Sequence, residues 1–256
     1  MRQSWAVTAL FFLANFAATA QPLSFNFRRV TAADGLNMSA VVAVCEDQYG
    51  YIWLGTTVGL NRFDGYKTKV YEHQFRDSTS LMPSAVRCLY RDSEGRLWIG
   101  FMNGLMEYDY ARDCFRNYDL QGATWVIQVL ETKPGTLFVA TGNGLVKLNT
   151  ATGEATTFDS LNTVGRGWDS QVRGMALHDN KLYLATRSGF SVFDLTTETW
   201  RPVHLPDVLK GLQVDQIAIS ASGDLWVAGR ADGDPIWRTT TRFDHWKKYT
   251  ELTHSA

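Results

Sequence analysis

Two tryptophans in loops carry the strongest chemical signal in this sequence. Trp125 and Trp168 lie outside the repeated strand positions described below, so core packing does not explain them. An exposed indole can stack on a sugar ring, and neighbouring polar side chains can hydrogen-bond to its hydroxyl groups. Two interpretations stay open: these aromatics plug a central channel, or they belong to a small-ligand site that suits an oligosaccharide. The candidate ligand-binding residues are Thr57, Asn103, Trp125, Asn143, Arg166, Trp168, Asp169, Arg187 and Arg230.

The sequence gives little indication of a catalytic site. It contains no HExxH metal site, no GxSxG nucleophile turn and no glycine-rich phosphate loop. In the strand pattern described below no histidine faces the centre of the molecule, so we expect no catalytic residue, metal or cofactor there. Asp232-Gly233-Asp234 resembles part of a calcium loop, but it lacks the regular spacing to a later glutamate, which favours an ordinary turn. The five histidines are His73, His178, His204, His245 and His254.

A repeated pair of strands must position these residues. Each copy has an aliphatic–aromatic–aliphatic strand that ends in Gly or Ala, then a short polar turn and a second strand. The central aromatics, which recur every 40 to 45 residues, are Trp53, Trp98, Phe138, Tyr183 and Trp226. A period of about 40 to 50 residues with several short strands per unit is typical of a β-propeller. The predicted fold class is therefore all-β, a β-propeller with five four-stranded blades.

The strand count also bears on how the ring closes. A further strand is expected at 25–30, ahead of the first blade, yet the last blade already has its own outer strand at 243–249. Because five whole units and one extra strand do not close neatly, we expect an incomplete six- or seven-bladed ring. The alternative is a closed five-bladed ring with a loosely attached N-terminal strand. The expected blades cover approximately residues 40–80, 85–120, 125–160, 171–205 and 213–250.

The repeated aromatics are expected to form the core between blades. Side chains alternate between the two faces of a strand, so Trp98 shares a face with Gly100. A large ring beside a tiny residue makes a knob and a hollow that the aliphatic face of the neighbouring blade can fill. Each such ring removes about 150 to 250 Å² from water, so at about 25 cal/mol per Å² this layer should be the main stabilising element. We expect all five rings to be buried in it.

The N-terminus resembles an export signal. Arg2 precedes an apolar run at 6–18, and Ala18-Thr19-Ala20 matches a small-residue cleavage site. We expect residues 1–20 to be a cleaved signal peptide and residues 21–256 to be a periplasmic propeller. An uncleaved anchor is the alternative, although the run is shorter than the roughly 20 residues of a membrane span. No second membrane span is expected.

The composition limits the classes of partner that we expect, and the cysteine count bears on whether disulfides form. The 256 residues are 45% hydrophobic with a net charge of −1, and no basic cluster is present, so a nucleic-acid partner is not expected. The three cysteines are Cys45, Cys88 and Cys114, an odd number without CxxC spacing. Cys45 and Cys88 occupy corresponding strands of adjacent blades and should not meet. We expect buried free thiols.

Two of the units resemble a known repeat. Residues 47–64 and 92–109 follow the pattern D-x-x-G-x-[LI]-W-[IL]-G-T-x-x-G-L-x-x-[FY]-D closely, and Asp34-Gly35-Leu36 resembles its usual lead-in. This pattern is similar to the two-component regulator propeller repeat. The resemblance extends over residues 24–250 and weakens along the chain, since the third unit has Phe138 and Ala140 in place of Trp and Gly.

In that family the propeller is the periplasmic sensor of a longer receptor, ahead of a β-sandwich, a membrane helix and a kinase or diguanylate cyclase. The resemblance implies a non-enzymatic sensing module, truncated from a longer receptor, that binds an oligosaccharide or another small ligand and pairs with a partner copy in a receptor dimer. One alternative is a propeller lyase or hydrolase, because residues 224–227 are similar to the repeat of streptogramin lyases. Others are a protein-interaction scaffold and a non-functional gene fragment.

Overall fold

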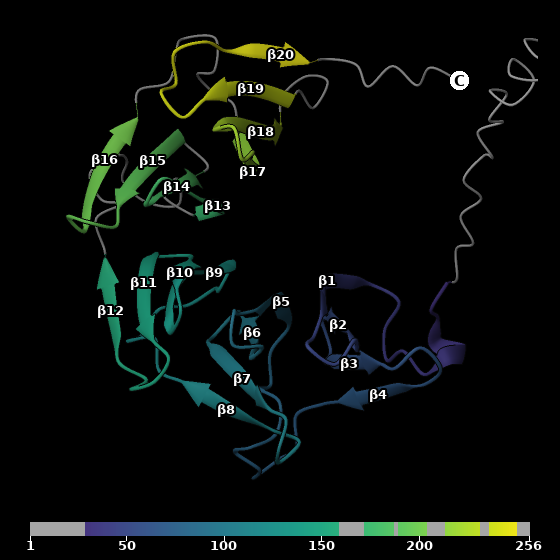
Figure 1. The fold of residues 1–256 in the computed structure, drawn as a ribbon. Coiled ribbons are helices and arrows are strands. Elements are labelled where there is room, and N and C mark those ends of the chain that lie inside the picture. Colours follow the sequence, from purple (N-terminus) through teal and green to yellow (C-terminus); the bar gives the residue numbers. More distant parts are fainter. Residues whose placement is uncertain (1–28, 159–171, 187–188, 204–212, 231–235, 250–256) are drawn as a thin grey trace, which may run out of the picture. The chain divides into compact units, whose positions relative to one another are not determined.

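The computed structural model describes residues 29–158, 172–186, 189–203, 213–230 and 236–249. The chain divides into two units, Met1–Val30 and Thr31–Ala256. Only Arg29 and Val30 of the first unit are described, so the expected signal peptide and positions 25–28 of the expected strand lie outside the described residues. Arg29 and Val30 themselves are not in a strand. The second unit is all-β, as predicted, and its described part forms five four-stranded antiparallel sheets (Figure 1). A short 3-10 helix, η2 (Ala32–Asp34), leads into the first sheet.

Each sheet is one blade, and its strands pair in sequence order. Blade 1 contains β1 (Val41–Glu46), β2 (Ile52–Thr56), β3 (Leu60–Phe63) and β4 (Thr68–Tyr71). Blade 2 contains β5 (Val86–Arg91), β6 (Leu97–Phe101), β7 (Leu105–Asp109) and β8 (Cys114–Tyr118). Blade 3 contains β9 (Gln128–Lys133), β10 (Thr136–Thr141), β11 (Gly144–Asn149) and β12 (Ala155–Phe158). Blade 4 contains β13 (Val172–His178), β14 (Lys181–Thr186), β15 (Gly189–Asp194) and β16 (Thr199–Val203). Blade 5 contains β17 (Gln213–Ile219), β18 (Asp224–Arg230), β19 (Ile236–Thr240) and β20 (Lys247–Tyr249).

The outer strand of blade 5 is shorter than expected. The sequence predicted a strand at 243–249, but β20 begins only at Lys247. Phe243 lies in the preceding turn with a left-handed backbone, φ 60°, and its N–H donates to the carbonyl of Thr240 at 2.9 Å. A residue in that conformation cannot continue a β-ladder. The prediction was therefore wrong for this residue, which packs between blades instead.

Each interface between consecutive blades joins an aromatic face to an aliphatic face. Trp53 of β2 is fully buried and packs in one cluster with Leu97 and Ile99 of β6 in the next blade. Trp98 and Phe138 are equally enclosed by the aliphatic residues of blades 3 and 4. Tyr183, 4% exposed, packs against blade 5. The predicted knob-and-hollow packing is confirmed at these four interfaces.

The fifth aromatic departs from that prediction. Trp226 is partly exposed and contacts Tyr249 of its own blade, with the ring centroids 5.6 Å apart. No further blade covers it among the described residues. At the other end of the series, Val44 is 63% exposed, whereas Val129 and Met175 at the same register position are each 2% exposed. These exposures agree with the expected incomplete ring, because closure of blade 5 onto blade 1 would bury both faces.

In the first two blades a buried aspartate ties the turn to the tryptophan. The Oδ2 atom of Asp92 accepts hydrogen bonds from Trp98 Nε1 at 2.9 Å and from Arg96 Nε at 2.7 Å. Its Oδ1 atom accepts from the Arg96 backbone N–H at 2.9 Å. In blade 1, Asp47 accepts from Trp53 Nε1 at 2.7 Å. The carboxylate therefore replaces water for both the turn and the buried indole.

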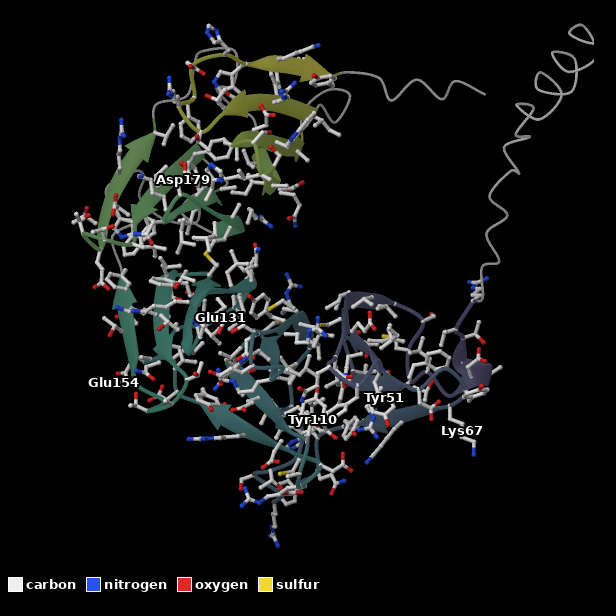
Figure 2. The ribbon with its side chains drawn as sticks, viewed as in Figure 1. Tyr51, Lys67, Tyr110, Glu131, Glu154 and Asp179 are labelled. Atoms are coloured by element: carbon white, nitrogen blue, oxygen red, sulfur yellow. The ribbon has the colours of Figure 1, made fainter. Side chains whose placement is uncertain are left out.

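Polar side chains form hydrogen bonds across the outer part of the interface between blades 1 and 2. The Asp113 carboxylate accepts hydrogen bonds from the hydroxyls of Tyr71, at 2.7 Å, and Tyr108, and forms an ion pair with Lys69. Partial burial raises the pKa of Asp113, but the hydrogen bonds from Lys69 and the two tyrosines outweigh it and lower the pKa to about 2. Tyr110, labelled in Figure 2, donates its hydroxyl to the turn aspartate of blade 1 at 3.1 Å. Blades 1 and 2 are thus joined by hydrogen bonds as well as apolar contacts.

Replacing Gly100 by alanine is expected to lower the free energy of unfolding by about 1 to 3 kcal/mol, the usual cost of overpacking. A Cβ atom at Gly100 would lie 2.5 Å from Val126 Cγ1 and 2.5 Å from Cys88 Sγ. Urea denaturation of Gly100→Ala, Val126→Ala and the double variant measures the coupling. We expect the double variant to be more stable than additivity allows. Strict additivity would contradict the packing described, and Ala140→Gly, at the same position of blade 3, is the control without a clash.

The three cysteines are free thiols, as expected, but they are partly rather than fully buried. Desolvation raises the pKa of the Cys88 thiol to about 12 and also raises that of Cys45. Both thiols therefore stay protonated at neutral pH and act as small apolar groups.

Candidate functional site

A pocket of about 320 Å³ lies where the first strands of blades 2, 4 and 5 begin, and Trp125 forms part of its wall. The Trp125 side chain is 41% exposed, which distinguishes it from the buried Trp53 and Trp98. It follows the last strand of blade 2 and precedes the first strand of blade 3, as expected of a loop residue. The lining residues are Arg87, Trp125, Ile127, Val172, Arg173, Asp215 and Gln216.

The backbone on both sides holds Trp125 in place. Its N–H donates to the Met102 carbonyl at 2.6 Å, and its carbonyl accepts from the Gly142 N–H at 3.0 Å. These bonds connect it to the β6–β7 turn of blade 2 and the β10–β11 turn of blade 3. Trp125 has φ 59°, an unfavourable backbone conformation for a bulky residue. Such conformations persist only where surrounding contacts enforce them and often occur at binding sites.

The lining combines a flat aromatic surface with charged groups of both signs. Arg87 is exposed and Arg173 is partly exposed, so their guanidinium groups can donate hydrogen bonds to a ligand. Asp215 adds a carboxylate, and Ile127 and Val172 add apolar surface. This arrangement suits a small ligand with a flat ring face and several hydroxyl or anionic groups. No serine, threonine, cysteine, lysine or histidine is among the described lining residues.

A repeated backbone irregularity explains why charged residues reach this pocket. The pairing between first and second strands shifts by one residue between Val86 and Cys88, and again between Val172 and Gly174. A β-bulge leaves the intervening residue out of the ladder and redirects its side chain. The intervening residues are Arg87 and Arg173, and Asp215 occupies the same position in blade 5. Sequence reasoning missed these three residues, although each directly follows the first valine of its strand.

Of the predicted ligand-binding residues, only Trp125 lines this pocket among those that the structure describes. Asn143 is exposed, but its Oδ1 accepts hydrogen bonds from the Thr124 N–H at 3.2 Å and from Thr141 Oγ1 at 3.3 Å. It therefore supports the loop that holds Trp125 rather than lining the pocket. Thr57 and Asn103 are exposed in the turns of blades 1 and 2.

The five other predicted ligand-binding residues lie wholly or partly outside the described part of the chain. Arg166, Trp168, Asp169 and Arg187 lie outside the described residues, as does the side chain of Arg230 at the end of β18. Within the described part of the chain no group of three or more His, Cys, Asp or Glu residues could hold a metal ion. The helical content there is too short to provide an apolar helix that crosses a membrane.

Comparison with known sequences points to one kind of repeat. Residues 35–57 and 80–103 match the family model of the two component regulator propeller. A segment of 72 residues, 28% of this chain, is 40% identical to histidine kinase P4 of Formosa agariphila. That segment is 5% of the kinase, so the chain spans a small fraction of this relative.

Solved structures share the fold at low sequence identity. The extracellular domain assigned to a hybrid two component system of B. thetaiotaomicron is similar with a TM-score of 0.69 and 20% identity, covering 86% of this chain and 31% of that one. Virginiamycin B lyase from Staphylococcus aureus is similar with a TM-score of 0.65 and 16% identity, covering 86% of this chain and 73% of that one. The chain thus spans less than a third of that extracellular domain. At these identities the likeness shows the β-propeller fold and no more.

Proposed function

We propose that this chain, which carries two-component regulator propeller repeats, is the ligand-sensing part of an extracytoplasmic receptor and that it works without catalysis. The matched repeats and the likeness to extracellular domains of hybrid two component systems support this proposal. In this proposal the chain is part of a longer protein and pairs with a second copy. Binding of a ligand to the chain sends a signal to an output module elsewhere in that protein.

The observation that carries the proposal is the exposed Trp125 held in an unfavourable backbone conformation beside two arginines. A ring exposed in a concave site, with donors and a carboxylate around it, matches the recognition of a saccharide. The indole would stack on the sugar ring, Arg87 and Arg173 would donate hydrogen bonds to its oxygens, and Asp215 would accept from a hydroxyl. The ligand class proposed is therefore an oligosaccharide.

Replacing Trp125 by alanine is expected to weaken saccharide binding by about 30-fold, because an aromatic anchor in a binding site typically contributes about 2 kcal/mol. Titration calorimetry against a panel of oligosaccharides measures the affinity of the wild-type chain and of the variant. Because Trp125 is 41% exposed, the midpoint of thermal unfolding should change little. Arg173→Gln should also weaken binding, since it removes a cationic donor from the lining.

Arg112→Gln is the matched control, because Arg112 is exposed in the β7–β8 turn and forms an ion pair only with Asp109 in the described structure. Its saccharide affinity should equal that of the wild type. Failure of the wild-type chain to bind any oligosaccharide of the panel would overturn the ligand class. Equal affinity of Trp125→Ala and wild type would show that the site lies elsewhere.

The alternative of a propeller lyase has a fold likeness in its favour and requires a catalytic histidine at the channel mouth. Among the described residues, the pocket around Trp125 is lined by arginines, one aspartate, one glutamine and apolar groups. The geometry therefore supports binding better than turnover. Incubation with a streptogramin substrate and a divalent metal, followed by product analysis, separates the two functions.

A further inference from the structure

One position in each blade sets the charge of the pocket around Trp125. It follows the first valine of the innermost strand, which in blade 3 lies just ahead of β9. In blades 1, 2, 4 and 5 the strand pairing shifts at this position. In four of the five blades the residue there lines the pocket, and these include every charged residue of the described lining. In chain order the residues at this position are Val42, Arg87, Ile127, Arg173 and Asp215.

The backbone beneath the two arginines is held by buried contacts. The valine that precedes each of them, Val86 or Val172, is fully buried. In blade 4 the Gln128 side chain also donates to the Met175 carbonyl at 2.8 Å and accepts from the Met175 N–H at 2.7 Å, two residues along the strand from the arginine. The base of each arginine is therefore fixed, and changing the side chain leaves these contacts in place.

The charges of the described lining do not balance. Neither Arg87 nor Arg173 forms a hydrogen bond or an ion pair among the described residues. In contrast, Arg96 is paired with a buried carboxylate at 2.7 Å. Two guanidinium groups and the carboxylate of Asp215 give the described lining a formal net charge of +1.

The pocket is small enough for these charges to act together. A sphere of about 320 Å³ is about 8.5 Å across, less than the Debye length of about 10 Å at 0.1 M salt. An acidic group in the pocket is therefore attracted by both guanidinium groups even where it contacts only one of them. A concave site with charge of one sign also concentrates ligands of the opposite sign.

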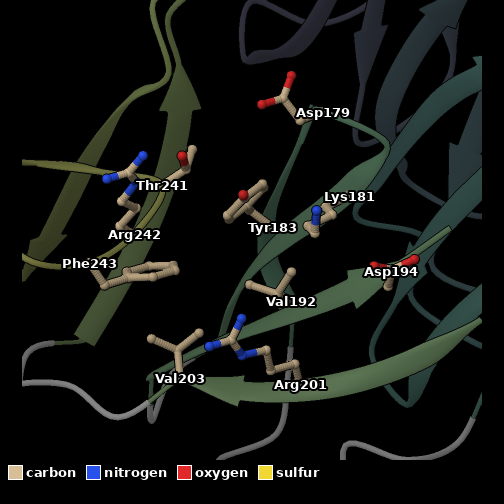
Figure 3. Close-up of a pocket in the computed structure, with 10 residues that line it drawn as sticks. All are labelled: Asp179, Lys181, Tyr183, Val192, Asp194, Arg201, Val203, Thr241, Arg242 and Phe243. Carbon is tan, nitrogen blue, oxygen red and sulfur yellow. The ribbon is translucent and has the colours of Figure 1, made fainter. Parts of the chain in front are cut away.

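A second cavity, of about 580 Å³ between blades 4 and 5, is the rival position for an acidic ligand (Figure 3). Its lining also has a formal net charge of +1, from three cations and two carboxylates. The aromatic residues of this lining pack on each other, however: Tyr183 is 4% exposed and contacts Phe243, with ring centroids 6.1 Å apart. The pocket around Trp125 instead joins its positive charge to an indole that is 41% exposed.

We propose that the pocket around Trp125 selects an acidic oligosaccharide, one that contains a uronate, over its uncharged counterpart. The indole would stack on a sugar ring, and the carboxylate of the uronate would lie toward Arg87 or Arg173. A guanidinium group can bind a carboxylate with two parallel charge-assisted hydrogen bonds, which an uncharged sugar does not offer. This inference rests on the proposed saccharide binding and adds the charge of the ligand.

Titration calorimetry with the trisaccharides of galacturonate, glucuronate and mannuronate, each compared with its methyl ester, tests this selection. The ester keeps the rings, linkages and hydroxyl groups and removes the charge. At least one acid should bind at least about tenfold more tightly than its ester, because charge-assisted hydrogen bonds are about twice as strong as neutral ones. This preference should shrink when the salt concentration is raised from about 50 to about 500 mM, since salt screens the attraction.

Variants of the lining should change the ratio of acid affinity to ester affinity in both directions. Arg87→Gln and Arg173→Gln should each lower this ratio at least about threefold. Asp215→Asn should raise it, because the formal charge of the described lining increases from +1 to +2. Arg201→Gln is the matched control, since it removes an exposed arginine from the cavity between blades 4 and 5. It should leave the ratio unchanged.

The outcomes separate this inference from the proposed function. If the esters bind as tightly as the acids, saccharide sensing stands and the selection for charge is overturned. An unchanged ratio in both Arg87→Gln and Arg173→Gln, or a ratio that falls in Arg201→Gln instead, would also overturn it. If no acid, ester or neutral saccharide binds, the proposed function fails as well. The thermal midpoint of each variant should match the wild type, because neither pocket arginine is buried.

Discussion

Trp98→Ala is expected to lower the free energy of unfolding by about 3 to 5 kcal/mol, the range for aromatic-to-alanine changes in cores. Trp98 is fully buried, and its ring packs on Tyr118 with centroids 4.9 Å apart and against the aliphatic residues of blade 3. Truncation leaves a cavity at the interface between blades 2 and 3. It also removes the indole donor from Asp92, whose carboxylate stays buried. Both effects act in the same direction.

Chemical denaturation monitored by circular dichroism measures this loss, and Trp226→Ala is the matched control. Trp226 holds the same register position in blade 5 but is partly exposed, and no described blade packs on its face. We expect its loss to be less than half that of Trp98→Ala. An equal loss in the two variants would contradict the assignment of stability to contacts between blades. Should Trp98→Ala not fold, Trp98→Phe, which keeps most of the ring, gives a smaller loss in the same direction.

Asp92→Ala is expected to lower the free energy of unfolding by about 3 kcal/mol, in the range for removal of one partner from a buried charged contact. Four hydrogen bonds end on this carboxylate, donated by Glu94 N, Arg96 N, Arg96 Nε and Trp98 Nε1. Alanine leaves the indole N–H and the turn N–H groups without acceptors, and each buried unsatisfied donor carries a cost of about 1 to 3 kcal/mol.

Asp92→Asn removes the negative charge but keeps one acceptor oxygen at the same place, so it distinguishes the effect of the charge from that of the hydrogen bonds. It should be less destabilising than Asp92→Ala in the same denaturation experiment. Asp109→Ala is the control, because Asp109 caps an exposed turn through the N–H groups of Ala111 and Arg112. Its effect should be much smaller. Equal effects of Asp92→Ala and Asp109→Ala would show that the buried carboxylate has no special role.

Much of the fold could be predicted from the sequence because its stability comes from a local pattern that is repeated. An aromatic residue followed two positions later by Gly or Ala is a local sign that this face of the strand packs against a neighbouring blade. The burial of Trp53 and Trp98 was therefore predicted correctly. Trp226 was not, because its local pattern is the same but its burial depends on a separate blade. The sequence of a strand therefore does not show whether a neighbouring blade covers it.

The pocket around Trp125 could be predicted only in part for a related reason. The exposure of Trp125 follows from its place in a loop, outside the repeat. Arg87 and Arg173 reach the pocket through β-bulges, and a one-residue shift in strand pairing has no clear composition signal.

The exposed faces of blades 1 and 5 have one further consequence. Val44 marks an aliphatic face and Trp226 an aromatic one, and these are the two halves of the contact that recurs between every pair of neighbouring blades. Surfaces that differ in kind yet fit each other form a heterologous contact, which extends from molecule to molecule without a built-in end point. A chain that displays both can therefore associate head to tail in solution, and whatever covers either face in the cell also prevents linear polymers.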